Sequence, residues 1–153
     1  MAKLFLSVAI VCFTCFLGWF FSMKLRKIKV FYLYFCDWND RFLTELRYAR
    51  RPLGEIIEQI PNKREFYREI RACVMKGEKA SLSFLSAEEK AYCENYFSAL
   101  GKGDALSQQS FFSAQSEKLK QRGAESAATA KKQTELYVKL GLLGGLALVV
   151  ILI

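Results

Sequence analysis

The chain has 153 residues, which leaves room for one folded domain once its two apolar ends are set aside. It contains no histidine, and this excludes histidine-based triads, most metal sites and the commonest general base. The 23 basic and 15 acidic residues give a net charge of +8, which suits nucleic acid, anionic lipid or an acidic partner, so the positions of the charges must decide.

The first predicted element is a transmembrane helix within residues 1–23. Its apolar part, Leu4 to Met23, contains no charged residue over twenty positions. A helix of that length rises about 30 Å, the thickness of a bilayer hydrocarbon core. The alternative is a cleaved signal peptide, which needs a shorter apolar core and small residues before the cut. Bulky side chains fill residues 19–21, so we predict that the helix is retained.

Between the apolar ends, residues 24–136 predict a helical domain. Apolar residues recur at steps of three and four, and no alternating pattern indicates a strand. Prolines, glycines and a Ser86–Glu89 capping box mark the ends of the helices. The expected helices are 24–51, 53–60, 64–76, 86–100 and a long one that runs from Ala105 into the second apolar segment. The predicted fold class is therefore all-α, a helical bundle between two transmembrane helices.

The second transmembrane helix is predicted at residues 137–153. Leu140 to Ile153 is apolar throughout, and Lys139 can extend its ammonium toward the lipid head groups. Gly141 and Gly145 form a Gly-x-x-x-Gly pattern with Gly144 beside them, which is typical of helices that approach each other closely in membranes. The alternative interpretation is that glycine is simply common in such helices. The packing partner is the first span or another copy.

Basic residues flank both predicted spans on the side of the central domain. They are Lys24, Arg26, Lys27, Lys29, Lys131, Lys132 and Lys139. Positive residues favour the cytoplasmic side, so we expect the central domain in the cytoplasm and a cell-membrane protein with two spans. Binding to anionic lipid accounts for the cluster from Lys24 to Lys29 at about 1 kcal/mol per cation, without any nucleic acid.

Few residues suggest catalytic chemistry. Gly101-Lys102-Gly103-Asp104 resembles a phosphate loop only superficially, because the Walker spacing and the preceding strand are missing. We interpret it as the end of one helix and the cap of the next. Glu88, Glu89 and Glu94 suit a solvated helix N-terminus. We predict no catalytic, cofactor-binding or metal-binding residue, and no cofactor.

The aromatic residues of the central domain allow two interpretations. Interleaved with basic residues they could stack on bases, but at helical spacing they are more often core. Tyr34 and Trp38 lie off the main apolar stripe, which leaves a partner surface there as an alternative.

Three segments carry a resemblance to the stage III sporulation protein AB family. Residues 135–153 are similar to the closing pattern of that family, and residues 100–104 with Gln108 resemble its Leu-Gly-x-x-Asp pattern and downstream Gln. Residues 45–48 and 52–55 resemble a third pattern, although Ala49 replaces a favoured glycine and residues 76–85 look shortened. The positions taken as family motifs are Glu45, Tyr48, Pro52, Leu53, Gly101, Asp104, Gln108 and Tyr137.

The resemblance implies a function that composition and spacing do not reveal. The family is similar to the inner-membrane platform proteins of type II secretion and type IV pilus machines. By that likeness the chain is expected to be a non-enzymatic adaptor in a channel complex between mother cell and forespore, on the mother-cell side. Its expected partners are a cytoplasmic ATPase, other membrane subunits of the complex, the lipid bilayer and a second copy of itself.

Two other functions remain open at this point. One is a small two-span pore-former of the holin type, although neither span carries a polar face and a folded domain is unnecessary for a lipid lesion. The other is a membrane-anchored interaction module unrelated to sporulation. A membrane-bound enzyme using carboxylates or the Cys73 or Cys93 thiol is disfavoured by the missing histidine.

Overall fold

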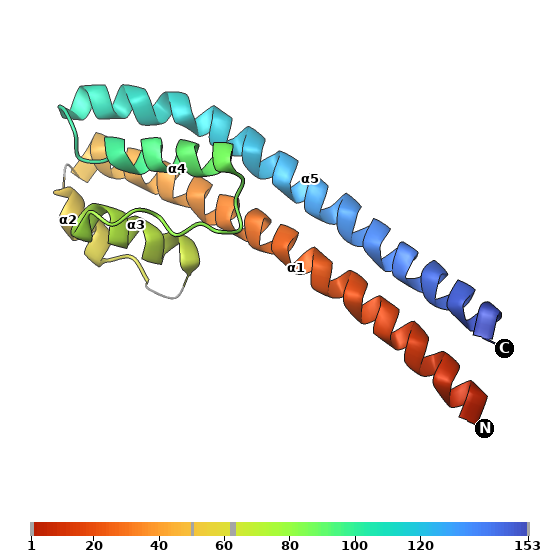
Figure 1. Ribbon diagram of the computed structural model, residues 1–153. Coiled ribbons are helices and arrows are strands. Elements are labelled where there is room, and N and C mark those ends of the chain that lie inside the picture. Colours follow the sequence, from red (N-terminus) through yellow and green to blue (C-terminus); the bar gives the residue numbers. More distant parts are fainter. Residues whose placement is uncertain (1, 50, 62–63, 153) are drawn as a thin grey trace. The chain divides into compact units, whose positions relative to one another are not determined.

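The computed structural model describes residues 2–49, 51–61 and 64–152, with the side chains of residues 2–8, 10, 11, 15, 21, 49, 148, 151 and 152 left out. Figure 1 shows the order of the elements. They are α1 (Ala2–Thr44), the π-helical turn η1 (Glu45–Ala49), α2 (Leu53–Glu58), α3 (Glu65–Lys76), α4 (Ala87–Ala99) and α5 (Ala105–Leu152). The described residues contain no strand, so the all-α prediction is confirmed.

The chain divides into two compact units. The terminal unit consists of Met1–Lys29 and Glu125–Ile153, and the central unit consists of Val30–Ala124. Helices α1 and α5 are continuous elements that contribute residues to both units. The central unit also contains all of α2, α3 and α4.

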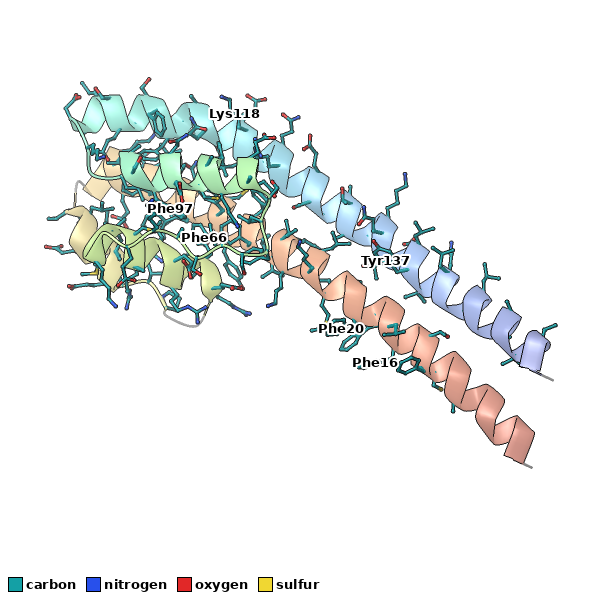
Figure 2. All side chains as sticks on the ribbon, viewed as in Figure 1. Phe16, Phe20, Phe66, Phe97, Lys118 and Tyr137 are labelled. Atoms are coloured by element: carbon teal, nitrogen blue, oxygen red, sulfur yellow. The ribbon has the colours of Figure 1, made fainter. Side chains whose placement is uncertain are left out.

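Aromatic side chains fill the core of the central unit. Phe35 is fully buried, and its ring centroid lies 4.6 Å from that of Tyr96 and 5.1 Å from that of Phe66. Phe42 meets Phe112 of α5 edge-on at 5.0 Å. Edge-on and tilted contacts of this kind add to the roughly 1.5–3 kcal/mol that burial of each large apolar side chain contributes. Figure 2 shows how densely side chains occupy this region, with Phe66 and Phe97 labelled.

The buried position of Trp38 corrects one sequence-based interpretation. Its side chain is fully buried and stacks on Phe42 at 5.6 Å, so Trp38 belongs to the core and not to a partner surface. Tyr34 is half-buried, packs against Tyr67 at 5.5 Å and lies beneath the Arg64 guanidinium. The apolar stripe of α1 is therefore wider than its three- and four-residue repeat suggests.

Local capping interactions end the helices where the sequence predicts. Ser86 and Glu89 form a reciprocal capping box at the start of α4, in which the Ser86 amide donates to Glu89 Oε2 at 2.9 Å. Gly77 ends α3 in the left-handed conformation, with a φ of 67° that a side chain would strain. These two features hold α3 and α4 at fixed lengths around the connection between them.

The terminal unit packs small residues between its two helices. Gly18 and Ser22 of α1 and Ala130 of α5 are buried, and the Ser22 hydroxyl donates to the Trp19 carbonyl at 2.7 Å. Large apolar side chains lie on the outside, among them Phe16 and Phe20, which are more than half exposed and labelled in Figure 2. The arrangement is thus the reverse of an ordinary water-soluble core.

Within the described residues, no helix has a stretch that is sufficiently long and apolar to cross a membrane. The two spans predicted at residues 1–23 and 137–153 include side chains outside the described set, such as those of 2–8 and 151–152.

Candidate functional site

Glu45, in the π-helical turn at the far end of α1, is bound to Arg51. The Arg51 guanidinium forms an ion pair with Glu45, and its Nε donates to Glu45 Oε2 at 2.9 Å. Another Arg51 nitrogen, Nη1, donates to Gln59 Oε1 at 3.0 Å, which ties the turn to the end of α2. Tyr48, in the same turn, is 83% exposed. The turn is therefore held rigidly while one aromatic side chain is presented to the outside.

The start of α2 lies against the loop between α4 and α5. Pro52 occupies the position before α2, and Leu53 is the first residue of that helix. A Cβ built on Gly101 would lie 3.0 Å from Leu53 Cδ2, and Gly101 has a φ of 73°. Glycine adopts this left-handed conformation without strain, and any side chain there would have to displace the Leu53 methyl group. Two segments almost fifty residues apart in the sequence are thereby joined.

Asp104 and Gln108 organise the beginning of α5. The Ser107 hydroxyl and the amides of Leu106 and Ser107 donate to Asp104, which holds the pKa of that carboxyl below its usual value. The Gln108 amide donates to the Asp104 carbonyl at 3.0 Å, and Gln108 Nε2 donates to the Gly103 carbonyl at 3.4 Å. Asp104 therefore acts as a helix cap, as the sequence predicts.

These contacts gather seven of the eight predicted motif positions at one end of the central unit, as Figure 1 shows. We call this region the motif end; it comprises η1, the start of α2, the Gly101–Gly103 loop and the start of α5. Leu106, which is 77% exposed, lies in the same region. The motif end thus combines a fixed backbone with two strongly exposed large side chains, those of Tyr48 and Leu106.

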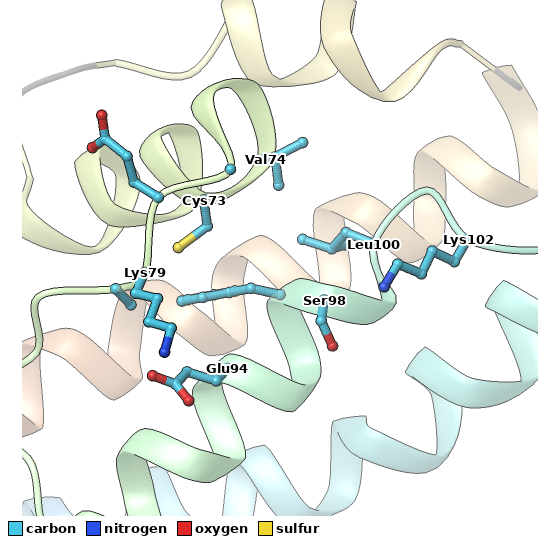
Figure 3. A pocket seen from close by; sticks show the side chains of 11 residues that line it. Cys73, Val74, Lys79, Glu94, Ser98, Leu100 and Lys102 are labelled. Carbon is cyan, nitrogen blue, oxygen red and sulfur yellow. The ribbon is translucent and has the colours of Figure 1, made fainter.

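Two hollows flank the C-terminal turn of α4 beside the motif end. The larger, of about 500 Å³, lies between α3 and α4 and is shown in Figure 3 with Cys73, Lys79 and Glu94 labelled. The smaller, of about 420 Å³, is lined by residues of α4 and of the first turns of α5, including Phe111. Ser98 and Lys102 line both. In their lining, the Ser98 hydroxyl donates to the Asn95 carbonyl at 3.0 Å, whereas a nucleophilic serine donates to a base.

The cysteines of the central unit are poor nucleophiles. Burial, together with the nearby Glu69, Glu94 and Glu78 carboxylates, raises the pKa of Cys73 to about 11. Burial also raises the pKa of Cys93 to about 12. Both thiols are protonated at neutral pH, whereas thiol chemistry requires the thiolate. Among the described residues, no three His, Cys, Asp or Glu side chains are grouped so that they could hold a metal ion.

The acidic residues at the start of α4 join a polar network. Glu88 accepts from Arg122 of α5 at 3.1 Å, and Tyr32 donates to Glu89 at 3.1 Å. The Arg122 guanidinium also lies over the Tyr92 ring, 4.7 Å from its centroid. The network connects α1, α4 and α5 of the central unit. The sequence predicts the position of these glutamates at a helix N-terminus, but it does not indicate that Arg122 and Tyr32 are their partners.

A comparison with known protein families decides the affiliation. The pattern of the family described as stage III sporulation protein AB matches residues 61–153, more than half of the chain. The chain belongs to this family. The match confirms the resemblance drawn from the sequence and is consistent with a role in sporulation. Comparisons with curated proteins and with solved structures find no match.

The matched residues cover part of the motif end and the second half of the terminal unit. Gly101, Asp104, Gln108 and Tyr137 lie inside the stage III sporulation protein AB match. Residues 45–53 precede it, yet the contact of Leu53 with the Gly101 loop makes them part of the same surface. Membership and geometry therefore indicate the same region of the central unit.

In the terminal unit, the predicted residues occupy different environments. All of the basic positions are exposed: Lys24, Arg26, Lys27, Lys29, Lys131, Lys132 and Lys139. Gly145 is buried and Gly141 half-buried, whereas a Cβ on Gly144 would meet nothing within 4 Å. A close approach of the two helices involves Gly18, whose Cβ position lies 2.7 Å from the Tyr137 carbonyl oxygen. Gly18 is not predictable from the sequence, because a lone glycine in an apolar helix has no recognisable pattern.

Proposed function

We propose that this member of the stage III sporulation protein AB family is a non-enzymatic adaptor in a secretion-like channel complex of endospore formation. The terminal unit anchors it in the cell membrane beside other subunits. The central unit faces the mother-cell cytoplasm and docks an ATPase on the motif end.

The arrangement of the motif end carries this proposal. An ion pair, a helix cap and the contact at Gly101 hold the backbone of the motif end in place. Tyr48 and Leu106 can therefore bind a partner at little cost in conformational entropy. Exposed aromatic and aliphatic side chains on a rigid support are the usual anchors of protein interfaces. The protonated state of the Cys73 and Cys93 thiols argues further for binding over catalysis.

The exposed apolar surface of the terminal unit supports membrane anchoring. Phe13 is 62% exposed, Leu143 62% and Val150 78%, on helices whose inner faces are built from small residues. Contiguous apolar surface of this kind requires lipid or another protein to cover it. The seven exposed cations of this unit add attraction to anionic head groups.

Co-purification from sporulating cells tests the docking surface. We expect the full-length chain, extracted in detergent, to bring down an ATPase identified by mass spectrometry and by ATP hydrolysis in the eluate. The double variant Tyr48→Ala with Leu106→Ser should reduce the captured ATPase at least tenfold, because about 1.4 kcal/mol of lost contact has that effect.

Leu33→Ser is the matched control. Leu33 is 63% exposed on α1 of the same unit but lies outside the motif end, so this variant should retain the ATPase. Equal capture by the wild type and the double variant would contradict docking at the motif end. Absence of any ATPase from the wild-type eluate would contradict the adaptor function itself.

A further inference from the structure

The contact at Gly18 fixes the register of the terminal unit. The Cβ position of Gly18 lies 2.7 Å from the Tyr137 carbonyl oxygen and 3.2 Å from its carbonyl carbon. The two helices run side by side in opposite directions, as Figure 1 shows. Backbone contact this close, without intervening side chains, places Gly18 and Tyr137 at the same height along the pair.

The pattern of burial along both helices agrees with this register. In the part of α1 that belongs to the terminal unit, the buried or half-buried positions among the described side chains are Thr14, Gly18, Ser22, Leu25 and Ile28. On α5 they include Ala130, Thr134, Tyr137, Gly141 and Gly145. Both helices rise about 1.5 Å per residue, so each step away from Gly18 is matched by one step away from Tyr137. Thr14 then faces Gly141, and Leu25 faces Ala130, as expected if these positions line the contact.

The same register sets the heights of the charged residues. Lys24 stands six positions beyond Gly18, level with Lys131, and Met23 is level with Lys132. Lys139 is level with Phe16, two positions before Gly18. The last residues of the first apolar segment, Phe20 to Met23, therefore lie beside the polar stretch 132–135 and not beside the apolar part of α5.

Only part of the first apolar segment therefore lies beside apolar residues of α5 at the same level along the helix pair. That part extends from Leu4 to Trp19, which are level with Ile151 and Leu136. These sixteen positions rise about 24 Å, less than the roughly 30 Å of a bilayer hydrocarbon core. At the boundary stand Trp19 and Tyr137, whose amphipathic rings prefer the border between acyl chains and head groups.

We propose that the side chains of Trp19 and Tyr137 lie at the membrane interface, between the acyl chains and the phospholipid head groups. The bilayer around the terminal unit is then thinner than an unperturbed bilayer. This inference rests on the proposed membrane anchoring and refines it. Lys24, Lys131 and Lys132, about 9 Å beyond the border, then lie among the lipid phosphates. Lys139 reaches the same layer by extending its side chain.

Quenching of tryptophan fluorescence by brominated phospholipids measures this border. The chain has two tryptophans, and Trp38 is fully buried in the central unit, out of reach of lipid. The full-length protein is reconstituted in phosphatidylcholine and phosphatidylglycerol vesicles that carry bromine either near the head group or near the end of the acyl chain. We expect Trp19 to be quenched more strongly by the shallow bromine.

Two variants calibrate the measurement. Trp19→Phe gives the background from Trp38, and Trp19→Phe with Phe13→Trp moves the indole about 9 Å deeper at an exposed position. The deeper indole should be quenched more strongly by the deep bromine. Stronger quenching of Trp19 by the deep bromine than by the shallow one would contradict its position at the membrane interface, but not membrane anchoring itself. Absence of quenching in the wild type and in the deep variant would overturn anchoring as well.

Discussion

The central and terminal units bury opposite kinds of side chain. In the central unit, rings such as those of Phe35 and Trp38 lie inside and the charges lie outside. In the terminal unit, Gly18 and Ser22 lie inside, and rings such as that of Phe13 face outward. Burial of apolar area stabilises the first arrangement in water, whereas close backbone packing holds the second. One chain therefore follows two packing rules along the same two helices.

Removal of a central ring should produce the largest effect. Phe35→Ala deletes a fully buried side chain that touches several other rings, and we expect a loss of about 3–5 kcal/mol in the free energy of unfolding. Denaturant unfolding of the detergent-solubilised protein, followed by circular dichroism, measures it. Phe111→Ala, at a ring that is 39% exposed, is the control and should cost much less. Equal costs would show that the ring cluster is not the core.

A side chain at the closest approach of the terminal helices is expected to have the next largest effect. Gly18→Leu would place carbon against the Tyr137 carbonyl and separate the helices, at a cost of about 3 kcal/mol. The readout is disulfide cross-linking between Thr14→Cys and Gly141→Cys in a chain whose other cysteines are replaced. Gly144→Leu, at a glycine with open space around it, should leave the cross-link unchanged. Full cross-linking in the Gly18 variant would refute the register.

The buried polar pair of the central unit should contribute less. The Tyr96 hydroxyl donates to Asn39 Oδ1 at 2.8 Å, and Asn39 is only 1% exposed. Tyr96→Phe leaves that oxygen without its donor and should cost about 1–2 kcal/mol in denaturant unfolding. Adding Asn39→Leu should restore part of the loss, because the unpaired oxygen is removed with its partner. A double variant as unstable as the sum of both single variants would contradict this coupling.

The smallest expected effect is a pH dependence at Glu89. Burial opposes ionisation, but the hydrogen bonds from Ser86 and Tyr32 and the Arg122 charge prevail and lower the pKa of Glu89. A lowered folded-state pKa stabilises the fold above the unfolded-state value of about 4.3, and this stabilisation is lost as the pH falls through the folded-state pKa. Glu89→Gln should therefore flatten the acid side of the stability profile measured by denaturant unfolding. If stability falls with decreasing pH in the same way in the variant and the wild type, Glu89 does not contribute to the pH dependence.

Capping residues made much of the central unit predictable. The Ser86–Glu89 capping box and Gly77 interact with residues close to them in sequence. The start of α4 and the end of α3 are therefore predictable from the sequence. Trp38 stands off the main apolar stripe and is nevertheless in the core, because which side of a helix is buried depends on how many helices surround it.

The candidate site was harder to predict than the helices. Three separate patterns are visible in the sequence, but none of them places Leu53 beside Gly101, because that contact requires the folded chain. The height of Tyr137 relative to Gly18 was equally inaccessible, since each apolar segment by itself permits any sliding of one helix along the other.

The π-helical turn Glu45–Ala49 has a consequence for how this chain tolerates change. A π turn accommodates one residue more than an α-helical turn. Deleting a residue there would let the helix continue in regular form and rotate everything beyond it by about 100°. Leu53 would then leave its position against Gly101, and Arg51 would leave Glu45. The length of this segment therefore matters in addition to the identities of Glu45 and Tyr48.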